Sequence, residues 1–345
     1  MAALLAALAT VVVCLACAVA FAGANPSRPA GPAASASAKT KAAASATTTA
    51  PGSAATTPDG VEGAPAVPAD GSLYLGLDGD DTTVPAFDAE TGISHPAVLG
   101  GYVAVGADFS GLLDEYAALP KTTPMISWKI DFTGGAVVDG KIDGYLRTQA
   151  NEVRAFGKPV FIRPDWEMNG TWMPQWSLPA VTPAQYIAAW RHVVDIFRQQ
   201  GVTNASFVWS PNANRYTNDP SSAWYPGDDY VDWIGLDGYP RVAAGDSLFV
   251  GVDGLDQMAQ FAQSHGKPVM LAEWAATLPD PDSGWAFDLV FEWAQRFPDT
   301  VKALVYFDYG SAGNDHLLSD QPIGAAEFRY LVKYGPKILL TVPAK

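Results

Sequence analysis

Eight short apolar runs, separated by amphipathic stretches, are the feature that most constrains how this chain can fold. Most of the runs are apolar almost throughout, which is typical of parallel strands buried on both faces. Repeated strand-then-helix units indicate the α/β class, and eight of them favour a closed (β/α)8 TIM barrel over an open sheet. The eight runs are Leu73–Asp78, Tyr102–Ala107, Pro124–Ile130, Pro159–Pro164, Ala205–Ser210, Val231–Asp237, Pro268–Ala272 and Val301–Phe307.

Helix signals lie between several of these runs. Thr182 followed by Pro183 is a good helix start, and the apolar stripe that follows continues to Gly201. The same periodicity predicts helices over residues 143–157, 255–266 and 285–297. No glycine-rich phosphate loop follows the first run, which argues against a nucleotide-binding fold.

Residues 1–70 do not have the composition of a folded domain. Residues 1–24 are apolar and end in small residues, as in a secretory signal peptide or an anchor. Residues 25–70 are rich in Ala, Ser, Thr and Pro, and we expect a disordered linker because so few large side chains cannot offset the ordering entropy. Residues 71–345 form the predicted catalytic domain. We therefore expect a secreted or cell-surface protein.

The charge and the cysteines exclude several functions. The chain has 36 acidic and 21 basic residues, a net charge of −15, which repels nucleic acid and anionic glycans but tolerates neutral sugars. Both cysteines, Cys14 and Cys17, lie in the N-terminal segment, so we expect no disulfide or thiolate site in the domain. The four histidines share no metal-ligand spacing, and no Gly-x-Ser-x-Gly motif is present. We expect no metal, no cofactor, no protein partner and a monomer.

Two glutamates stand where a barrel places its active site, just beyond strand ends. Glu167 follows the fourth run and Glu273 follows the seventh, each beside a tryptophan. Hydrolysis of a glycoside with retention needs two carboxyl groups about 5–5.5 Å apart, one as nucleophile and one as acid and then base. Alternation along the fourth strand also predicts that Arg163 and Asp165 point inward with Glu167.

The residues around both glutamates resemble a known family. Arg163-Pro-Asp-Trp-Glu-Met-Asn-Gly-Thr-Trp172 resembles the acid/base motif of glycoside hydrolase family 26, best known for endo-β-1,4-mannanases. Pro226–Tyr239 is similar to the family's approach to strand six, and Lys267–Glu273 to its nucleophile strand. The resemblance implies a retaining endo-β-glycosidase that acts on mannan-type polysaccharide, a neutral β-linked substrate.

Carried over to this sequence, the resemblance implies roles for further residues. Glu167 becomes the general acid/base and Glu273 the nucleophile, while Tyr239 hydrogen-bonds the nucleophile with Asp237 beside it. The motif also places Asn169 and the aromatic Trp172 at the substrate, and we include Trp166, Asp237 and Tyr239 among the substrate-binding residues. Many mannanases carry His directly before the acid, where this chain has Trp166. That difference leaves the substrate open.

Aromatic side chains at strand ends are further candidates for sugar contact, because flat rings stack on the apolar faces of pyranoses. We assign Trp172 and Trp274 to sugar contact and include Trp128 and Tyr306 as candidates, although large aromatics also fill barrel cores. Two alternatives remain open. One is a β-glucanase or β-1,3-xylanase on the same scaffold, and the other is a non-catalytic glycan-binding module.

Overall fold

The computed structural model describes residues 63–345 except 80–81, 215, 246, 278–279 and 312–313. The predicted signal segment and most of the predicted linker lie outside the described residues. In the described part of the chain, no helix has the length and apolarity needed to cross a bilayer.

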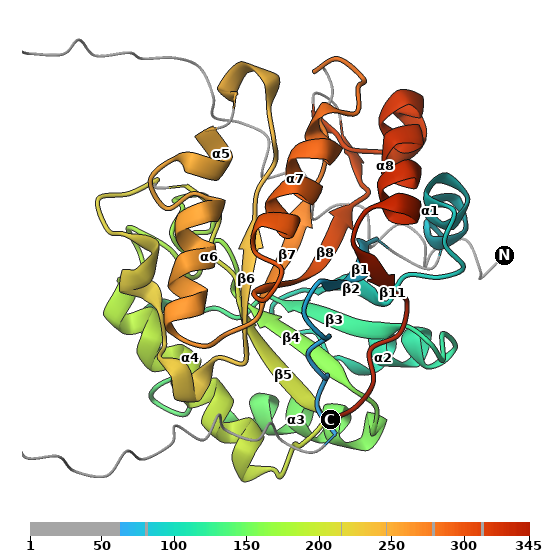
Figure 1. The fold of residues 1–345 in the computed structure, drawn as a ribbon. Helices are drawn as coiled ribbons and strands as arrows, with labels where there is room; N and C mark the ends of the chain where they lie inside the picture. Colours follow the sequence, from blue (N-terminus) through green and yellow to red (C-terminus); the bar gives the residue numbers. More distant parts are fainter. Residues whose placement is uncertain (1–62, 80–81, 215, 246, 278–279, 312–313) are drawn as a thin grey trace, which may run out of the picture. The chain divides into compact units, whose positions relative to one another are not determined.

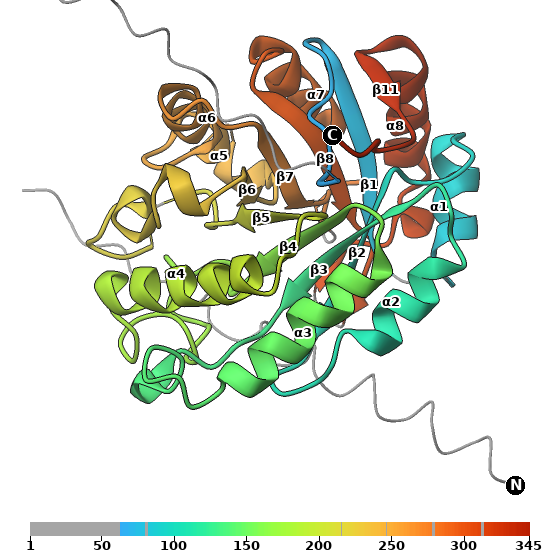
Figure 2. The same ribbon diagram turned by 90° about the horizontal axis from the view of Figure 1, so that it is seen from below.

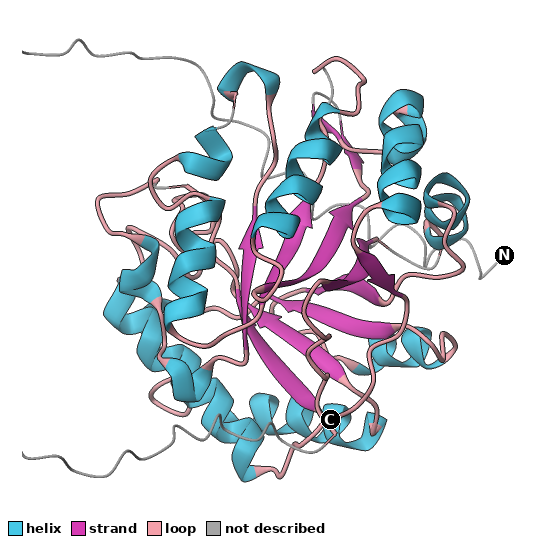
Figure 3. Cartoon of the chain, in the orientation of Figure 1, coloured by secondary structure: helices cyan, strands magenta, loops and turns pink. Residues whose placement is uncertain are grey.

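The described chain forms a (β/α)8 barrel, which confirms the predicted fold class. Strands β1 to β8 pair in chain order and in parallel, and β8 also pairs with β1, which closes the sheet. Helices surround the strands on the outside (Figures 1 and 3), and α2 and α3 run side by side there (Figure 2). The barrel strands are β1 (Ser72–Asp78), β2 (Val98–Val103), β3 (Thr123–Trp128), β4 (Val160–Pro164), β5 (Ala205–Trp209), β6 (Trp233–Asp237), β7 (Val269–Trp274) and β8 (Val301–Phe307).

The connections between consecutive barrel strands contain α-helices, with one exception. In the described part of the connection between β5 and β6, the helices are two short 3₁₀ turns, η3 (Ser221–Trp224) and η4 (Asp228–Tyr230). The α-helices are α1 (Val84–Thr91), α2 (Ser110–Ala117), α3 (Asp143–Phe156), α4 (Pro183–Gln199), α5 (Ser247–Val250), α6 (Leu255–Ser264), α7 (Trp285–Arg296) and α8 (Pro322–Tyr334). The remaining elements are η2 (Thr133–Gly135), η5 (Val242–Ala244), η6 (Leu318–Asp320), the pair β9 (Gly310–Ser311) and β10 (Asn314–Asp315), and β11 (Lys337–Leu339).

Helix α4 begins where its sequence predicts. The Thr182 side chain accepts a hydrogen bond from the Gln185 amide, and the Gln185 side chain accepts one from the Thr182 amide. This capping box satisfies two amides at the helix start that would otherwise lack partners. Helix α3 ends at Gly157, whose φ of 67° is a left-handed conformation that glycine adopts without strain.

Strand β2 differs from its predicted position. The apolar run Tyr102–Ala107 predicts the second strand, but the strand runs from Val98 to Val103. Its glycines are needed for space: a Cβ on Gly100 would lie 2.5 Å from Oδ1 of Asp78, and one on Gly101 would lie 2.5 Å from the Tyr116 hydroxyl. The shift moves Tyr102 from the beginning of the strand to its carboxyl end, where barrel active sites form.

Two cores lie on the two faces of the sheet. Side chains inside the barrel, including Phe161, Trp233 and Met270, form a separate buried cluster. A larger cluster fills the space between the strands and the surrounding helices. This division fills the barrel below the strand ends and leaves only the carboxyl ends for polar groups.

The opposite end of the barrel is closed by both ends of the described chain. Gly63 and Ala66 donate backbone hydrogen bonds to Lys345 and Pro343, at 3.2 and 2.9 Å, and Val342 belongs to the buried cluster inside the barrel. Residues 63–70, which the sequence analysis assigns to the linker, are therefore hydrogen-bonded to the domain. Their composition gives no sign of this, because the contacts are with residues far along the chain.

Candidate active site

The candidate acid, Glu167, lies just beyond β4 in a segment with unusual backbone angles. Asp165 and Glu167 have φ values of 45° and 54°, which cost roughly 1–3 kcal/mol each in non-glycine residues and persist only where neighbours enforce them. The enforcing contacts come from both sides: the Asp165 amide donates to the Trp128 carbonyl at 3.0 Å, and the Glu167 amide donates to the Ser210 carbonyl at 2.7 Å. The ends of β3 and β5 thus fix the direction of the Glu167 side chain.

Neutral N–H groups hold the Glu167 carboxyl group. The Trp172 indole donates to Oε2 at 2.7 Å, and the Asn212 side-chain amide donates to Oε1. Glu167 is 8% exposed. Burial, followed by the negative charge of Glu273, raises the pKa of Glu167 to about 7. A carboxyl group in this state can carry a proton near neutral pH.

A bulge in β7 turns Glu273 toward the site. Leu271 aligns with Leu304 and Trp274 with Tyr306 on β8, so β7 uses three steps where β8 uses two. An extra residue reverses the side to which the following side chains point. Glu273 therefore faces the site, while Trp274 points outward to the helices.

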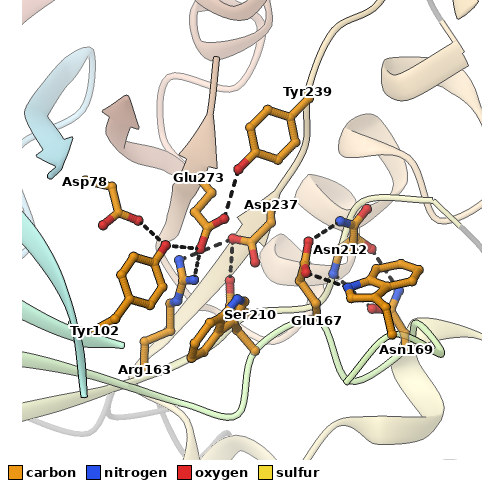
Figure 4. A network of polar contacts seen from close by, with 12 residues as sticks. Asp78, Tyr102, Arg163, Glu167, Asn169, Ser210, Asn212, Asp237, Tyr239 and Glu273 are labelled. Carbon is orange, nitrogen blue, oxygen red and sulfur yellow. Dashed lines mark hydrogen bonds and ion pairs between the residues drawn. The ribbon is translucent and has the colours of Figure 1, made fainter. Parts of the chain in front are cut away.

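The candidate nucleophile, Glu273, is held by a cation and two hydroxyl groups (Figure 4). Oε1 accepts hydrogen bonds from the Tyr102 hydroxyl at 2.7 Å and from the Arg163 guanidinium, and Oε2 accepts one from the Tyr239 hydroxyl at 2.9 Å. Glu273 is 5% exposed. Because a guanidinium interacts more strongly with a carboxylate than with a neutral carboxyl group, this environment favours an anion.

Asp237 lies between the two glutamates in the same network (Figure 4). It is fully buried, accepts a hydrogen bond from the Ser210 hydroxyl at 3.0 Å, and lies 3.4 Å from the Arg163 guanidinium. Burial raises the pKa of Asp237 well above its ordinary value. Asp237 is therefore a buried partner of Arg163 with no surface exposed to a substrate. This corrects its sequence-based assignment as a substrate-binding residue.

Of the predicted substrate-binding tryptophans, two lie at the site. Trp172 is partly exposed and contacts Glu167 directly. The Trp166 ring lies 5.2 Å from the ring of Tyr102 and 4.9 Å from the Arg163 guanidinium carbon, so it packs beside the residues that hold Glu273. It is 4% exposed, which leaves only its edge for a ligand.

Three other predicted contacts are wrong. Trp128, Trp274 and Tyr306 have no exposed surface, and each packs among aromatic rings between the sheet and the helices. Strand alternation explains Trp128 and Tyr306, which point outward from β3 and β8, and the bulge explains Trp274. Their large side chains stabilise the fold without reaching the site.

Two polar predictions also change. Asn169 is buried, and its side-chain amide forms hydrogen bonds within the protein. Its Oδ1 accepts from the Asn212 backbone amide at 2.9 Å, and its Nδ2 donates to the Asn212 backbone carbonyl at 2.8 Å. It positions Asn212 against Glu167 instead of binding sugar. Asp165 does not join Glu167 at the site either, since its Oδ1 accepts from the Ile130 amide at 2.7 Å. The left-handed backbone after Pro164 ends the alternation that predicted it.

The sequence analysis did not identify three residues of the network: Asp78, Tyr102 and Asn212. Asp78 is the last residue of β1, and its Oδ2 lies 2.7 Å from the Tyr102 hydroxyl. The rule that strand ends carry chemistry was sufficient to find Asp78. Tyr102 was missed because the predicted second strand placed it at the wrong end. Asn212 lies three residues past the end of β5, the same offset as Glu167 from the end of β4, so the same rule was sufficient to find it.

Among the described residues, no group of three or more His, Cys, Asp or Glu side chains is arranged to hold a metal ion. The one buried cation of the network, Arg163, contacts both Asp237 and Glu273. The site thus combines a carboxyl group that can be protonated with a carboxylate held as an anion, a pair suited to acid catalysis with nucleophilic attack.

Comparison with known sequences gives a consistent match. The sequence model of glycosyl hydrolase family 26 matches residues 128–305. Endoglucanase H of Acetivibrio thermocellus is 36% identical over 220 residues, which cover 61% of this chain and 24% of that protein. The beta-1,3-xylanase TXYA of a Vibrio species is 30% identical over 140 residues, 40% of this chain and 28% of that protein. A mannan endo-1,4-beta-mannosidase of Bacillus subtilis is 29% identical over 174 residues, 47% and 42% of the two chains.

The chain spans about a quarter of the length of the first two of these relatives. Among solved structures, the Bacillus subtilis mannanase BCman has a TM-score of 0.59 at 20% identity, covering 79% of this chain and 88% of its own. An endo-beta-1,4-mannanase of Cellulomonas fimi has a TM-score of 0.61 at 20% identity, covering 79% and 73%. At this identity the two structures support the fold alone.

Proposed function

Because the chain belongs to glycosyl hydrolase family 26, and is therefore a glycoside hydrolase, we propose that it is a retaining endo-β-glycosidase that hydrolyses β-1,4-mannosidic bonds in mannan-type polysaccharide. Glu167 is the general acid/base and Glu273 the nucleophile. The observation that carries the proposal is the pair of unlike carboxyl environments, one that favours a proton and one that favours a charge.

In the first step, a carboxylate oxygen of Glu273 bonds to the anomeric carbon while Glu167 gives its proton to the glycosidic oxygen. The bond between that oxygen and the anomeric carbon breaks, the leaving sugar departs as a neutral alcohol, and the other sugar remains esterified to Glu273. Hydrogen bonds from Tyr102 and Tyr239 keep the Glu273 carboxylate oriented for this attack.

In the second step, Glu167 must act as a base instead of an acid. The charge of Glu273 is one of the two causes that raise the pKa of Glu167. Once Glu273 is esterified that charge is gone, so the pKa of Glu167 falls and the residue becomes a base. Glu167 then takes a proton from water, the water oxygen attacks the anomeric carbon, and Glu273 leaves as the carboxylate with overall retention.

A second substrate class, β-glucan, is favoured by two observations. Trp166 stands where many mannanases carry His, and an indole offers one donor and no acceptor to a sugar hydroxyl. The relative at 36% identity is named an endoglucanase, whereas the mannosidase from Bacillus subtilis is 29% identical. β-1,3-Xylan is a third substrate that the same two carboxyl groups can serve.

The test is hydrolysis of three purified polysaccharides: β-1,4-mannan, mixed-linkage β-glucan and β-1,3-xylan. We expect new reducing ends from mannan at the highest kcat/KM, an early fall in viscosity that marks internal cleavage, and a first product with the β configuration by NMR. Higher activity on glucan overturns the mannan assignment, and an α first product overturns retention. Binding without new reducing ends on any polysaccharide indicates the non-catalytic module instead.

We also propose that the protein is exported, on the composition of residues 1–24. Expression of the full chain in a bacterial host, followed by mass spectrometry of the protein from the medium and from the membrane, tests this. Recovery only from the cytoplasm with residues 1–24 intact contradicts it.

A further inference from the structure

The Tyr102 hydroxyl lies between two carboxyl groups. Its oxygen is 2.7 Å from Oδ2 of Asp78 and 2.7 Å from Oε1 of Glu273. Both distances are typical of O–H···O hydrogen bonds. A tyrosine hydroxyl has only one proton, so it can donate to only one of the two carboxyl groups.

Two such contacts therefore require two protons. Tyr102 supplies one and keeps it, because burial and the two neighbouring acids raise its pKa well above the ordinary value. The second proton must lie on Asp78 or on Glu273. Without it, one contact would bring the lone pairs of two oxygens together with no hydrogen between them.

The surroundings of the two acids decide where the second proton lies. Glu273 receives hydrogen bonds from the Arg163 cation and from Tyr239, which satisfy a carboxylate. Asp78 is fully buried, has Tyr102 as the partner of Oδ2, and has no hydrogen-bond partner for Oδ1 among the described residues. Burying a charge without donors is costly, whereas a buried neutral acid needs only an acceptor for its proton.

We propose that Asp78 is a positioning residue: it is held as a neutral carboxylic acid and donates its proton to the Tyr102 oxygen, so that the Tyr102 proton is directed to Oε1 of Glu273. The inference rests on the proposed function, because it takes Glu273 as the nucleophile. The chain of donors then runs in one direction, from β1 through β2 to β7.

The charges around Asp78 agree with this assignment. Burial and the charge of Glu273 raise the pKa of Asp78 to about 7, against the opposing effects of Arg163 and the Tyr102 hydrogen bond. Asp308, the residue after β8, donates its backbone amide to the Asp78 backbone carbonyl at 3.1 Å, and its own carboxyl group accepts a hydrogen bond from the Leu318 amide. Gly100 on β2 leaves room for the Asp78 side chain, because a Cβ there would lie 2.5 Å from Oδ1 of Asp78.

The first test compares Asp78→Asn with Asp78→Ala. The Asn amide keeps a neutral donor toward Tyr102, so we expect kcat to stay within about threefold of the wild type, whereas Ala lacks the donor and lowers kcat about tenfold or more with little change in KM. Circular dichroism and thermal melts confirm that both variants fold. Equal losses of kcat in Asn and Ala overturn the proposal.

The pH profile separates a neutral Asp78 from a charged one. A neutral Asp78 predicts that Asp78→Asn leaves the acidic limb of the kcat/KM profile in place and makes the alkaline limb less steep, since one ionisation near neutral pH is lost. If Asp78 is an anion in the active protein, the same variant removes a negative charge beside Glu273, and the acidic limb moves to lower pH. That result contradicts the proposal.

A neutron structure of the wild-type protein after exchange into D₂O tests the proton positions without a variant or an assay. We expect deuterium on Oδ2 of Asp78 and the Tyr102 deuterium pointing to Glu273. A bare Asp78 with the Tyr102 deuterium pointing to it overturns the inference. Because this measurement needs no turnover, an inactive wild-type protein counts against the proposed function and leaves the proton assignment to be judged by the neutron map.

Discussion

The two glutamates of the site are held by opposite kinds of partner. Glu167 receives hydrogen bonds from an indole and an amide, both neutral N–H donors. Glu273 receives them from a guanidinium and from two hydroxyl groups. Neutral donors orient a carboxyl group and only partly offset its burial, whereas a cation ties it to its ionised form. The same side chain is thereby placed in two different electrostatic environments, as the two proposed roles require.

Removing each carboxyl group gives the largest effect and separates the two roles. Glu273→Gln should lower kcat at least about 10⁴-fold on any substrate, as loss of a nucleophile does. Glu167→Gln should cost about 10²- to 10⁴-fold on polysaccharide. Aryl glycosides with good leaving groups need no acid, so they should form the glycosyl-enzyme rapidly in Glu167→Gln but not in Glu273→Gln.

Glu292→Gln, on the exposed face of α7, is the matched control for both variants and should be as active as the wild type. If the aryl glycoside restores the first step in Glu273→Gln instead, the two roles are exchanged.

Tyr239→Phe removes one hydroxyl from Glu273 and keeps the ring. A hydrogen bond to a charged group contributes about 1.5–3 kcal/mol, so kcat should fall about 10- to 100-fold while KM changes little. Tyr330→Phe on α8, which removes the hydroxyl of an exposed ring, is the control. Unchanged kcat in Tyr239→Phe would show that Glu273 does not depend on its donors.

Trp172→Phe has a smaller effect and a different signature. The indole N–H lowers the pKa of Glu167 by stabilising its anion, so its loss should raise that pKa further. We expect the alkaline limb of the kcat/KM profile to move to higher pH and kcat to fall a few-fold. A limb that moves to lower pH contradicts the assignment of Glu167 as the acid.

The smallest effect is on stability. The pKa of Glu167 is raised in the folded protein, so its contribution to stability is complete below the unfolded pKa and is lost as pH rises through about 7. Glu167→Gln has no such ionisation. Its melting temperature should therefore fall less than that of the wild type between acidic and mildly alkaline pH, by about 2–4 °C for each kcal/mol that Glu167 loses. Parallel melting curves contradict the raised pKa.

Much of this molecule could be predicted from local sequence patterns. The stripe and caps of α4 and the apolar runs of most strands depend on neighbours a few residues away, and these predictions are confirmed. Glu167 and Glu273 were found because barrel strands deliver their last residues to one end. The network brings both residues together, as the sequence analysis expects, while their catalytic roles remain predictions.

Two of the errors, the bounds of β2 and the direction of Trp274, have one physical cause, which is contact between distant residues. Gly100 lies before the predicted second strand, yet it belongs to β2, where the Asp78 side chain leaves no space for a Cβ. The sequence predicts that Trp274 contacts sugar, yet a bulge in β7 turns Trp274 outward and Glu273 toward the site. The pairing of β7 with its neighbouring strands sets this bulge. Neither the space beside Gly100 nor the bulge is encoded in the adjacent residues alone.

The backbone contacts between residues 63–66 and 343–345 have a consequence for how the barrel can be built. Since Gly63 and Lys345 are hydrogen-bonded neighbours, a short peptide joining them would make the domain a ring, and the ring could be cut at an exposed connection such as that between α3 and β4. A circular permutant opened there should assemble the same polar network from strands synthesised in a new order. The chemistry depends on which strands are adjacent in space, and the order of synthesis is free to vary.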